Sequence, residues 1–292
     1  MQKQVPESFR YLFRPRRKTV KALDSVSFLV KQGELVAYAG PNGAGKSTTI
    51  KLLGGMLAQN AGEISVLGLS PLRNRIALMR KLGVLFGNRT ELWWDHPVSS
   101  SYRWKRKVWD IPKNDFEEME ALVLDLLDIR PFYQTFAREL SLGQRMRADL
   151  GMLLLHRPSL VLLDEPTLGL DVLAKRRMIG FLKSLNEKEG TTVIVTSHDM
   201  DDLEEMTHRI LLISNGRIAF DGSFANLRNE LGCTRKAVVD FRDGTRREFA
   251  YQDTNLMLAE LARMENIADI SFTQTSLEEG MANLYEKWKN NH

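Results

Sequence analysis

This chain of 292 residues has little cysteine and no long apolar run, and each absence excludes a class of protein. It has one cysteine, Cys233, so an internal disulfide is excluded and the composition fits a reducing compartment. Its longest apolar runs, such as residues 160–163, have the length of a strand, far below the ~20 residues of a transmembrane helix. Residues 1–6 show no apolar stretch of a secretory signal, and neither internal repeats nor low-complexity tracts occur. We therefore expect a folded globular protein that does not span a membrane.

Neither sign of charge dominates, with 41 Lys and Arg against 37 Asp and Glu. The small excess lies in residues 1–21, which contain seven basic residues and one acid, whereas the remainder has 34 basic and 36 acidic residues. We interpret residues 1–18 as a basic arm that is either solvated or lies against anionic lipid or an acidic partner. Nucleic acid is another partner for such an arm, but the rest of the chain has no basic excess to support it.

The most informative segment is a glycine-rich run made of Gly40, Pro41, Asn42, Gly43, Ala44, Gly45, Lys46, Ser47 and Thr48. It satisfies G-x-x-x-x-G-K-S/T, the phosphate loop of nucleotide-binding proteins. The glycines let the backbone N–H groups approach the phosphates, Lys46 would reach the β- and γ-phosphates, and the Ser47 hydroxyl would hold Mg²⁺. An apolar strand pattern at 34–39 precedes the run and a helical pattern at 48–53 follows it, which is the arrangement that phosphate binding needs.

Apolar segments alternate with helical patterns over the first 230 residues. Residues 160–163 and 192–196 are apolar almost throughout, as in strands buried on both faces of a parallel sheet. We also expect short strands within residues 19–32 and at 64–67. Helical patterns lie at 116–127 (with Met119, Leu122, Leu126 and Leu127 on one face), 144–156, 174–187 and 201–206. The alternation predicts an α/β layered fold.

The pattern changes near residue 230. Residues 236–250 predict two strands joined at Asp243-Gly244, and residues 255–264 and 267–273 predict a helix and a strand. Ser276 and Glu279 form a capping box for a last helix. We interpret residues 231–292 as a small α+β domain without a catalytic motif, which supports a dimer or regulates the protein.

Three further motifs follow the phosphate loop: Leu140-Ser141-Leu142-Gly143-Gln144-Arg145, then Leu163-Asp164-Glu165-Pro166 with Leu168-Gly169-Leu170-Asp171, then Thr196-Ser197-His198-Asp199. In this order, the four motifs resemble the ATP-binding subunit of ABC transporters over about residues 19–225. The resemblance implies a P-loop NTPase fold of the ABC ATPase type at 19–230, with a helical subdomain at about 89–157.

The resemblance also implies catalytic roles. Glu165 looks like the general base that polarises the attacking water. Asp164, at the end of an apolar strand, would support the Mg²⁺ shell through water. His198 would contact the γ-phosphate and orient the water.

In the family, Ser141, Gly143 and Gln144 belong to a signature motif that binds the ATP held by the other subunit's phosphate loop, and Asp171 links the two sites across the dimer. The signature usually has glycine where this chain has Leu142. We expect Leu142 to be tolerated, because its side chain can face away from the nucleotide.

Two positions depart further from the family pattern. Asn88 stands where the family has a glutamine that touches Mg²⁺ and senses the membrane subunit. Coordination would then pass through water, coupling would be weaker, or Glu91 would be recruited instead. The usual adenine-stacking aromatic is also missing, and Tyr11, Phe13 or Arg17 would replace it, with Tyr11 or Phe13 favoured.

Four of the five tryptophans lie within 17 residues: Trp93, Trp94, Trp104 and Trp109. They form either a local core or a docking groove for a cytoplasmic helix of a permease. Their place just after Asn88 favours docking near Trp93, Trp94 and Trp104. This stretch resembles a branch of bacterial exporters with separately encoded permeases.

The main hypothesis is therefore an ATP- and Mg²⁺-dependent ATPase subunit of an ABC exporter at the cytoplasmic face of the membrane. It would pair with a second copy or a paralogous ATPase subunit and with one or two permease subunits, and no nucleic acid is expected. The alternative is a soluble ABC ATPase acting on nucleic-acid or translation complexes, for which the basic arm is the supporting feature. A regulatory module without turnover is disfavoured by the intact Glu165 and His198.

Overall fold

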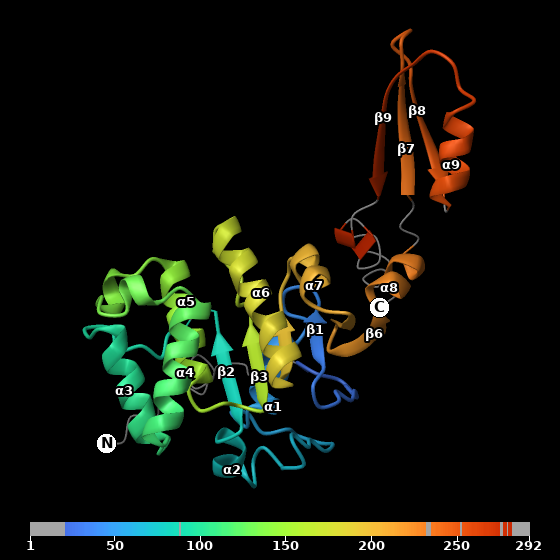
Figure 1. Cartoon of the computed structure of the whole chain (residues 1–292). Helices are drawn as coiled ribbons and strands as arrows, with labels where there is room; N and C mark the ends of the chain where they lie inside the picture. Colours follow the sequence, from blue (N-terminus) through green and yellow to red (C-terminus); the bar gives the residue numbers. More distant parts are fainter. Residues whose placement is uncertain are drawn as a thin grey trace, which may run out of the picture.

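The computed structural model describes residues 21–87, 89–231, 235–251, 253–274, 277–278 and 280–281. A six-stranded sheet in the order β2-β3-β4-β1-β5-β6 forms the centre of the larger part of the chain (Figure 1). Adjacent strands of this sheet run parallel to each other, except β5 and β6, which are antiparallel. The strands are β1 (Leu35–Ala39), β2 (Leu82–Phe86), β3 (Leu160–Asp164), β4 (Thr192–Thr196), β5 (Arg209–Ser214) and β6 (Arg217–Ser223).

The apolar runs form strands because both faces of this sheet are covered. In β3, Leu160 and Leu162 point into one core, and Val161 and Leu163 into the other. The first core contains α1 (Lys46–Leu53) and α2 (Arg75–Met79). The second contains α5 (Leu142–Leu154), α6 (Val172–Glu189) and α7 (Met200–Met206). The predicted α/β layered fold is confirmed.

A helical segment lies between β2 and β3 and ends in α5. It consists of α3 (Val98–Val108), α4 (Lys113–Leu126), the short 3₁₀ turns η2 (Arg130–Phe132) and η3 (Ala137–Glu139), and α5. Phe116, Met119 and Val123 form the buried stripe of α4. The prediction that Leu122 and Leu126 share this face is wrong: they are 39% and 46% exposed, because they lie on the flank of a stripe spaced at three and four residues.

Two predicted strands do not form. Residues 21–32 contain no strand, and residues 64–67 contribute only an isolated bridge between Val66 and Leu69. The alternation of apolar and polar residues does predict which side chains are partly buried, since Val26 and Phe28 pack against the core that contains α1. No neighbouring strand continues the ladder, however, and the backbone is held by single contacts such as Asp24 N–H to the Gly216 carbonyl, 2.7 Å.

After α8 (Phe224–Glu230) the chain forms a second sheet in the order β8-β7-β9. It comprises β7 (Arg235–Phe241), β8 (Arg246–Tyr251) and β9 (Ile267–Gln274), with α9 (Thr254–Leu261) packed on one face in a small core of its own (Figure 1). The predicted hairpin, helix and strand are confirmed. Leu277 and Met281 are buried in the same core as Phe224 and Leu227 of α8. The predicted cap residues Ser276 and Glu279 lie outside the described residues, as does Cys233.

Candidate nucleotide site

The phosphate loop connects β1 to α1, and Gly45 is the N-cap of that helix. Gly45 has a φ of 116°, and a Cβ there would lie 2.9 Å from the Ala22 carbonyl oxygen, so both conformation and space favour glycine. No side chain caps α1 and its first turn has no acid. The helix therefore presents its backbone N–H groups and positive dipole end to an anion.

Lys46 is the buried cation of this loop, with 7% of the residue exposed. Its Nζ donates to the carbonyls of Gly40 (2.7 Å) and Pro41 (3.3 Å). Burial lowers the pKa of Lys46, while the nearby carboxylates of Glu165 and Asp164 act in the opposite direction. A cation with carbonyl partners at a loop edge can exchange them for phosphate oxygens, so the loop fits a polyphosphate.

Asp164 and Thr196 end neighbouring strands and face each other in register. Thr196 Oγ1 donates to Asp164 Oδ1 (2.7 Å), and the Glu165 N–H donates to the Thr196 carbonyl (3.1 Å). Thr196 thus fixes both carboxylate residues, a role that the sequence analysis missed. The available signal was its place at the end of an apolar strand, the same place that Asp164 occupies in β3.

Glu165 adopts the left-handed conformation, with a φ of 58°, directly after β3. This conformation is unfavourable for a residue with a side chain and is held here by the hydrogen bonds to Thr196. It aims the carboxylate at His198, whose Nδ1 lies 2.7 Å from Oε2. An ionised carboxylate can only accept, so this hydrogen bond assigns a proton to Nδ1.

The loop, Glu165 and His198 line one open groove of about 440 Å³. Its lining residues are Ala22, Asn42, Gly43, Gly45, Lys46, Ser47, Thr48, Glu165, Leu168 and His198. The structure therefore brings together a cation, an uncapped helix N-terminus, a carboxylate and an imidazole. These are the groups needed to bind phosphates and to polarise a water beside them.

Ser47 lines the groove and carries a hydroxyl for a divalent ion, whereas Asp164 is 9% exposed and does not line the groove. The described residues contain no group of three or more His, Cys, Asp or Glu that could hold a metal. A Mg²⁺ ion at this site would therefore complete its shell with phosphate oxygens and water, which is its usual mode of binding. Glu91 does not line the groove; its carboxylate pairs with Lys105 Nζ of α3 at 3.2 Å.

Several predicted ligands fall outside the described residues. They are Asn88 and the three candidates for adenine stacking, Tyr11, Phe13 and Arg17. The segment just after Asn88 is described, and it is fastened to α5. The carboxylate Oδ1 of Asp149 accepts hydrogen bonds from Thr90 Oγ1 and from the Glu91 N–H, both 2.9 Å. Burial raises the pKa of Asp149 to about 6.

The predicted signature residues lie at the N-terminus of α5. Ser141 and Gln144 form a reciprocal capping box, with the Gln144 N–H donating to Ser141 Oγ (3.2 Å) and the Ser141 N–H to Gln144 Oε1 (2.9 Å). A Cβ on Gly143 would find only ordinary contacts, the nearest being Leu170 Cδ2 at 3.6 Å. Nothing in the described part of this chain therefore requires glycine there. None of these residues lines the groove.

Asp171 lies at the other end of the segment that begins at Glu165. Its carboxylate caps α6 by accepting from the Ala174 N–H at 2.8 Å. Like the signature residues, it does not line the groove of this chain.

The tryptophans divide into two groups. Trp93, Trp94 and Trp104, called the tryptophan surface below, are 39%, 50% and 37% exposed. Trp93 packs on Trp104, with ring centroids 5.5 Å apart, and Arg145 of α5 lies over Trp94. Trp109 instead packs against the core beneath Lys105. The interpretation as local core thus fits Trp109 alone.

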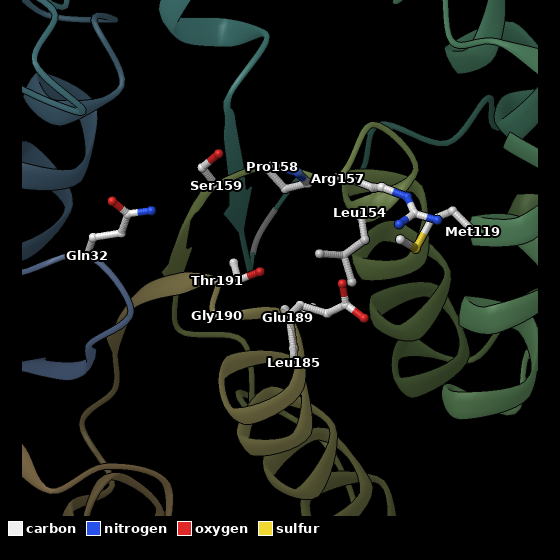
Figure 2. A pocket seen from close by; sticks show the side chains of 10 residues that line it. All are labelled: Gln32, Met119, Leu154, Arg157, Pro158, Ser159, Leu185, Glu189, Gly190 and Thr191. Carbon is white, nitrogen blue, oxygen red and sulfur yellow. The ribbon is translucent and has the colours of Figure 1, made fainter. Parts of the chain in front are cut away.

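A second cavity of about 150 Å³ lies at the opposite ends of β3 and β4. Figure 2 shows Met119, Leu154 and Arg157 on one side and Leu185, Glu189 and Thr191 on the other. None of the predicted site residues lines this cavity, so the nucleotide groove is the site that the motifs build.

Comparison with known proteins identifies the family of this chain. Residues 23–168 match the family described as ABC transporter. The linearmycin resistance ATP-binding protein LnrL of Bacillus subtilis is 30% identical over 74% of this chain and 68% of its own length. The methionine import ATP-binding protein MetN of Carboxydothermus hydrogenoformans is 28% identical over 71% of this chain and 63% of its own. The chain matches between 26% and 87% of the length of four further curated relatives. For three of these four, the matched part is less than two thirds of the relative's length.

The fold has solved counterparts. A dimeric ATP-binding cassette, MJ0796, in a post-hydrolysis state bound to ADP and Pi superposes with a TM-score of 0.65 at 23% identity, covering 72% of this chain and 94% of that one. This likeness shows the P-loop fold of ABC ATPase cassettes. The chain belongs to the ABC transporter family.

Within the described residues, every helix is too short or too polar to cross a membrane.

Proposed function

We propose that the chain hydrolyses Mg²⁺-ATP to power an ABC exporter whose membrane subunits are separate proteins. The observation that supports this most strongly is the groove in which Lys46, Glu165 and His198 meet at the uncapped N-terminus of α1.

Each residue has a role that its contacts allow. Residues 40–48 bind the phosphates through backbone N–H groups, and Lys46 exchanges its two carbonyl partners for phosphate oxygens. Ser47 and Asp164 are the residues that would hold Mg²⁺, which would neutralise charge on the phosphates. Glu165 accepts the proton of the attacking water, and His198 orients Glu165 and that water through its hydrogen bond.

The proposed active unit is a head-to-tail dimer with a second copy or a paralogous subunit. Ser141, Gly143 and Gln144 lie outside the groove of their own chain, and Gly143 has no packing reason within it. A surface without a Cβ at a helix N-terminus suits close approach by a phosphate held on another chain. Asp171 would then lie between the two sites.

The proposed partner in the membrane docks on the tryptophan surface. Three exposed indole rings, one of them beneath Arg145, are the type of surface that anchors a helix. Asp149 fastens the segment after Asn88 to α5, so a helix docked there would be linked to the signature residues. This arrangement would place the chain on the cytoplasmic face of the membrane. Export is the proposed direction, on the resemblance at residues 92–97 and 140–147.

We further propose that the ATPase domain extends over 19–230, with its helical subdomain at about 89–157, and that residues 231–292 are a separate α+β domain. The separate small core under α9 supports this division for residues 235–274, whereas Leu277 and Met281 pack into the core that contains α8. That domain would support the dimer or regulate it.

The experiment that tests this function is affinity purification of the tagged chain from detergent-solubilised membranes, followed by mass spectrometry. We expect one or two polytopic membrane proteins to copurify. Substituting Trp94→Ala should lower their recovery about tenfold, because a buried interface tryptophan typically contributes more than 1 kcal/mol. The matched control is Phe272→Ala on β9, an aromatic residue of similar exposure in the C-terminal sheet (47% against 50%).

Equal losses for Trp94→Ala and Phe272→Ala would contradict docking at the tryptophan surface. Recovery of ribosomes or nucleic-acid proteins alone would favour the alternative, an ABC ATPase that acts on nucleic-acid or translation complexes. Salt-sensitive binding of RNA that is lost on deleting residues 1–18 would support that alternative further.

A further inference from the structure

We propose that Leu142 is a positioning residue that transmits the state of the signature segment to Glu165 of the same chain. The inference rests on the proposed function, in which residues 141–144 meet ATP bound to a partner. It concerns the hydrophobic side chain that this sequence has where the family usually has glycine.

The side chain of Leu142 fits against a glycine in the segment that follows Glu165. A Cβ on Gly169 would lie only 2.6 Å from Leu142 Cδ2, so this methyl group fills the space that a side chain at 169 would need. Gly143 and Leu170 also lie next to each other, since a Cβ on Gly143 would lie 3.6 Å from Leu170 Cδ2, an ordinary van der Waals distance. The start of α5 thus packs directly on residues 169–170.

Residues 165–171 connect this contact to the catalytic groove. The Leu168 N–H donates to the Glu165 carbonyl (3.3 Å), and the Leu170 N–H donates to the Thr167 carbonyl (3.2 Å). The segment is therefore a series of tight turns, fixed at one end by Glu165 on Thr196 and at the other by Asp171 on α6. Because the turns between the two attachments are tight, a displacement of Gly169 is passed on to Glu165 at one end and to Asp171 at the other.

The consequence is a route between the two ATP sites within one chain. Contact of a partner's ATP with the start of α5 would press Leu142 on Gly169. Because the segment is short and held at both ends, Glu165 would be moved into or out of its position beside His198. With glycine at 142 this contact would be missing, and the two motifs would be less tightly linked.

The test is steady-state ATP hydrolysis by the full chain, with ATP affinity measured separately without Mg²⁺. We expect Leu142→Ala to lower kcat at least fivefold and leave the ATP dissociation constant within twofold, because Leu142 does not line the groove. Leu142→Met should restore kcat to within about twofold of the original chain. Leu122→Ala is the matched control, since Leu122 is an equally exposed leucine on α4 (39% against 38%) and should leave kcat unchanged.

A double-mutant cycle examines the contact itself. Gly169→Ala adds a Cβ at 2.6 Å from Leu142 and at a φ of 72°, so kcat should fall. In the Leu142→Ala background the clash with the leucine methyl group is absent, so Gly169→Ala should lower kcat by a smaller factor. Equal factors in both backgrounds, or a kcat for Leu142→Ala within twofold of the original, would overturn the inference. Absence of ATP hydrolysis by the unsubstituted chain would instead overturn the proposed function.

Discussion

At the scale of single residues, the site depends on side chains whose conformation is costly in isolation. Glu165 occupies the left-handed region, which for a residue with a Cβ costs about 1–2 kcal/mol. Its N–H has two acceptors on Thr196, and its carboxylate has His198. The cost is thus offset by contacts with Thr196 and His198, which hold the carboxylate in one orientation.

Asp149 makes the stability of the protein depend on pH. Its pKa is about 6 in the folded chain against an ordinary 3.8, because it is buried. Between these values the folded chain holds a proton that the unfolded chain has released. Stability therefore falls as pH rises from about 4 to 6 and stays lower above that, by up to about 3 kcal/mol.

We predict that Asp149→Asn flattens this part of the pH profile. The amide oxygen can still accept from Thr90 and from the Glu91 N–H, and no charge is buried. At pH 8 the variant should be about 1–2 kcal/mol more stable than the original chain. The reason is that its neutral amide N–H₂ replaces the charged Oδ2, which lacks a partner among the described residues. Urea unfolding at pH 4.5 and pH 8 measures both quantities. Asp125→Asn is the control, since pairing with Arg130 lowers the pKa of exposed Asp125; identical profiles for Asp149→Asn and the original chain would refute the prediction.

At the scale of elements, α3 and α5 approach closely because one of them has a glycine. Tyr102 of α3 is fully buried and donates its hydroxyl to the Ala148 carbonyl of α5 at 2.9 Å. A Cβ on Gly151 would lie 2.2 Å from that hydroxyl and 2.9 Å from Ile129 Cδ1. The absence of a side chain at 151 therefore sets the distance between the two helices.

We predict that Gly151→Ala destabilises the chain by about 1–3 kcal/mol, the usual cost of overpacking. In a Tyr102→Phe background the clash with the hydroxyl is gone, so the same substitution should cost less. Chemical denaturation of the four proteins of the cycle gives both values. Gly180→Ala on α6 is the control, because no atom lies within 4 Å of its Cβ position and alanine favours a helix, so stability should rise by up to about 1 kcal/mol. Additive costs in the cycle would exclude the contact with Tyr102 as the cause.

Local sequence patterns predict some of the strands in this chain and not others. The hairpin at Asp243-Gly244 was predicted because turn residues and alternating strands occur together. The hairpin of β5 and β6 was not, although Asn215 and Gly216 at its turn have φ values of 48° and 73° and are a strong turn signal. Conversely, residues 21–32 alternate but form no strand, since a ladder needs a partner that the alternation does not reveal.

At the scale of the whole molecule, the proposed function requires a second chain, because the signature residues do not line the groove that they are proposed to complete. We predict that Glu165→Gln lowers ATP turnover at least about 100-fold, the contribution of a general base, while ATP binding persists. With Mg²⁺-ATP the variant should elute as a dimer in size-exclusion chromatography and return to monomer when ATP is removed.

Glu205→Gln is the control for this experiment, since Glu205 is exposed on α7 and does not line the groove. Turnover by Glu165→Gln equal to that of this control would contradict the assignment of the base. A dimer that forms equally well without nucleotide would contradict closure driven by ATP.

The phosphate loop, the two carboxylates at the end of β3, the signature motif and the α/β class follow from the sequence alone. These depend on residues that are contiguous in the chain, so strand, loop and helix signals suffice to place them. Only the tertiary structure decided that β4 lies beside β3, which joins Thr196 to Asp164 and His198 to Glu165 across more than 30 residues. It also decided that Leu142 meets Gly169 and that Asp149 is buried under residues 90–91. Such contacts depend on which segments pack against one another, and local spacing carries no record of that.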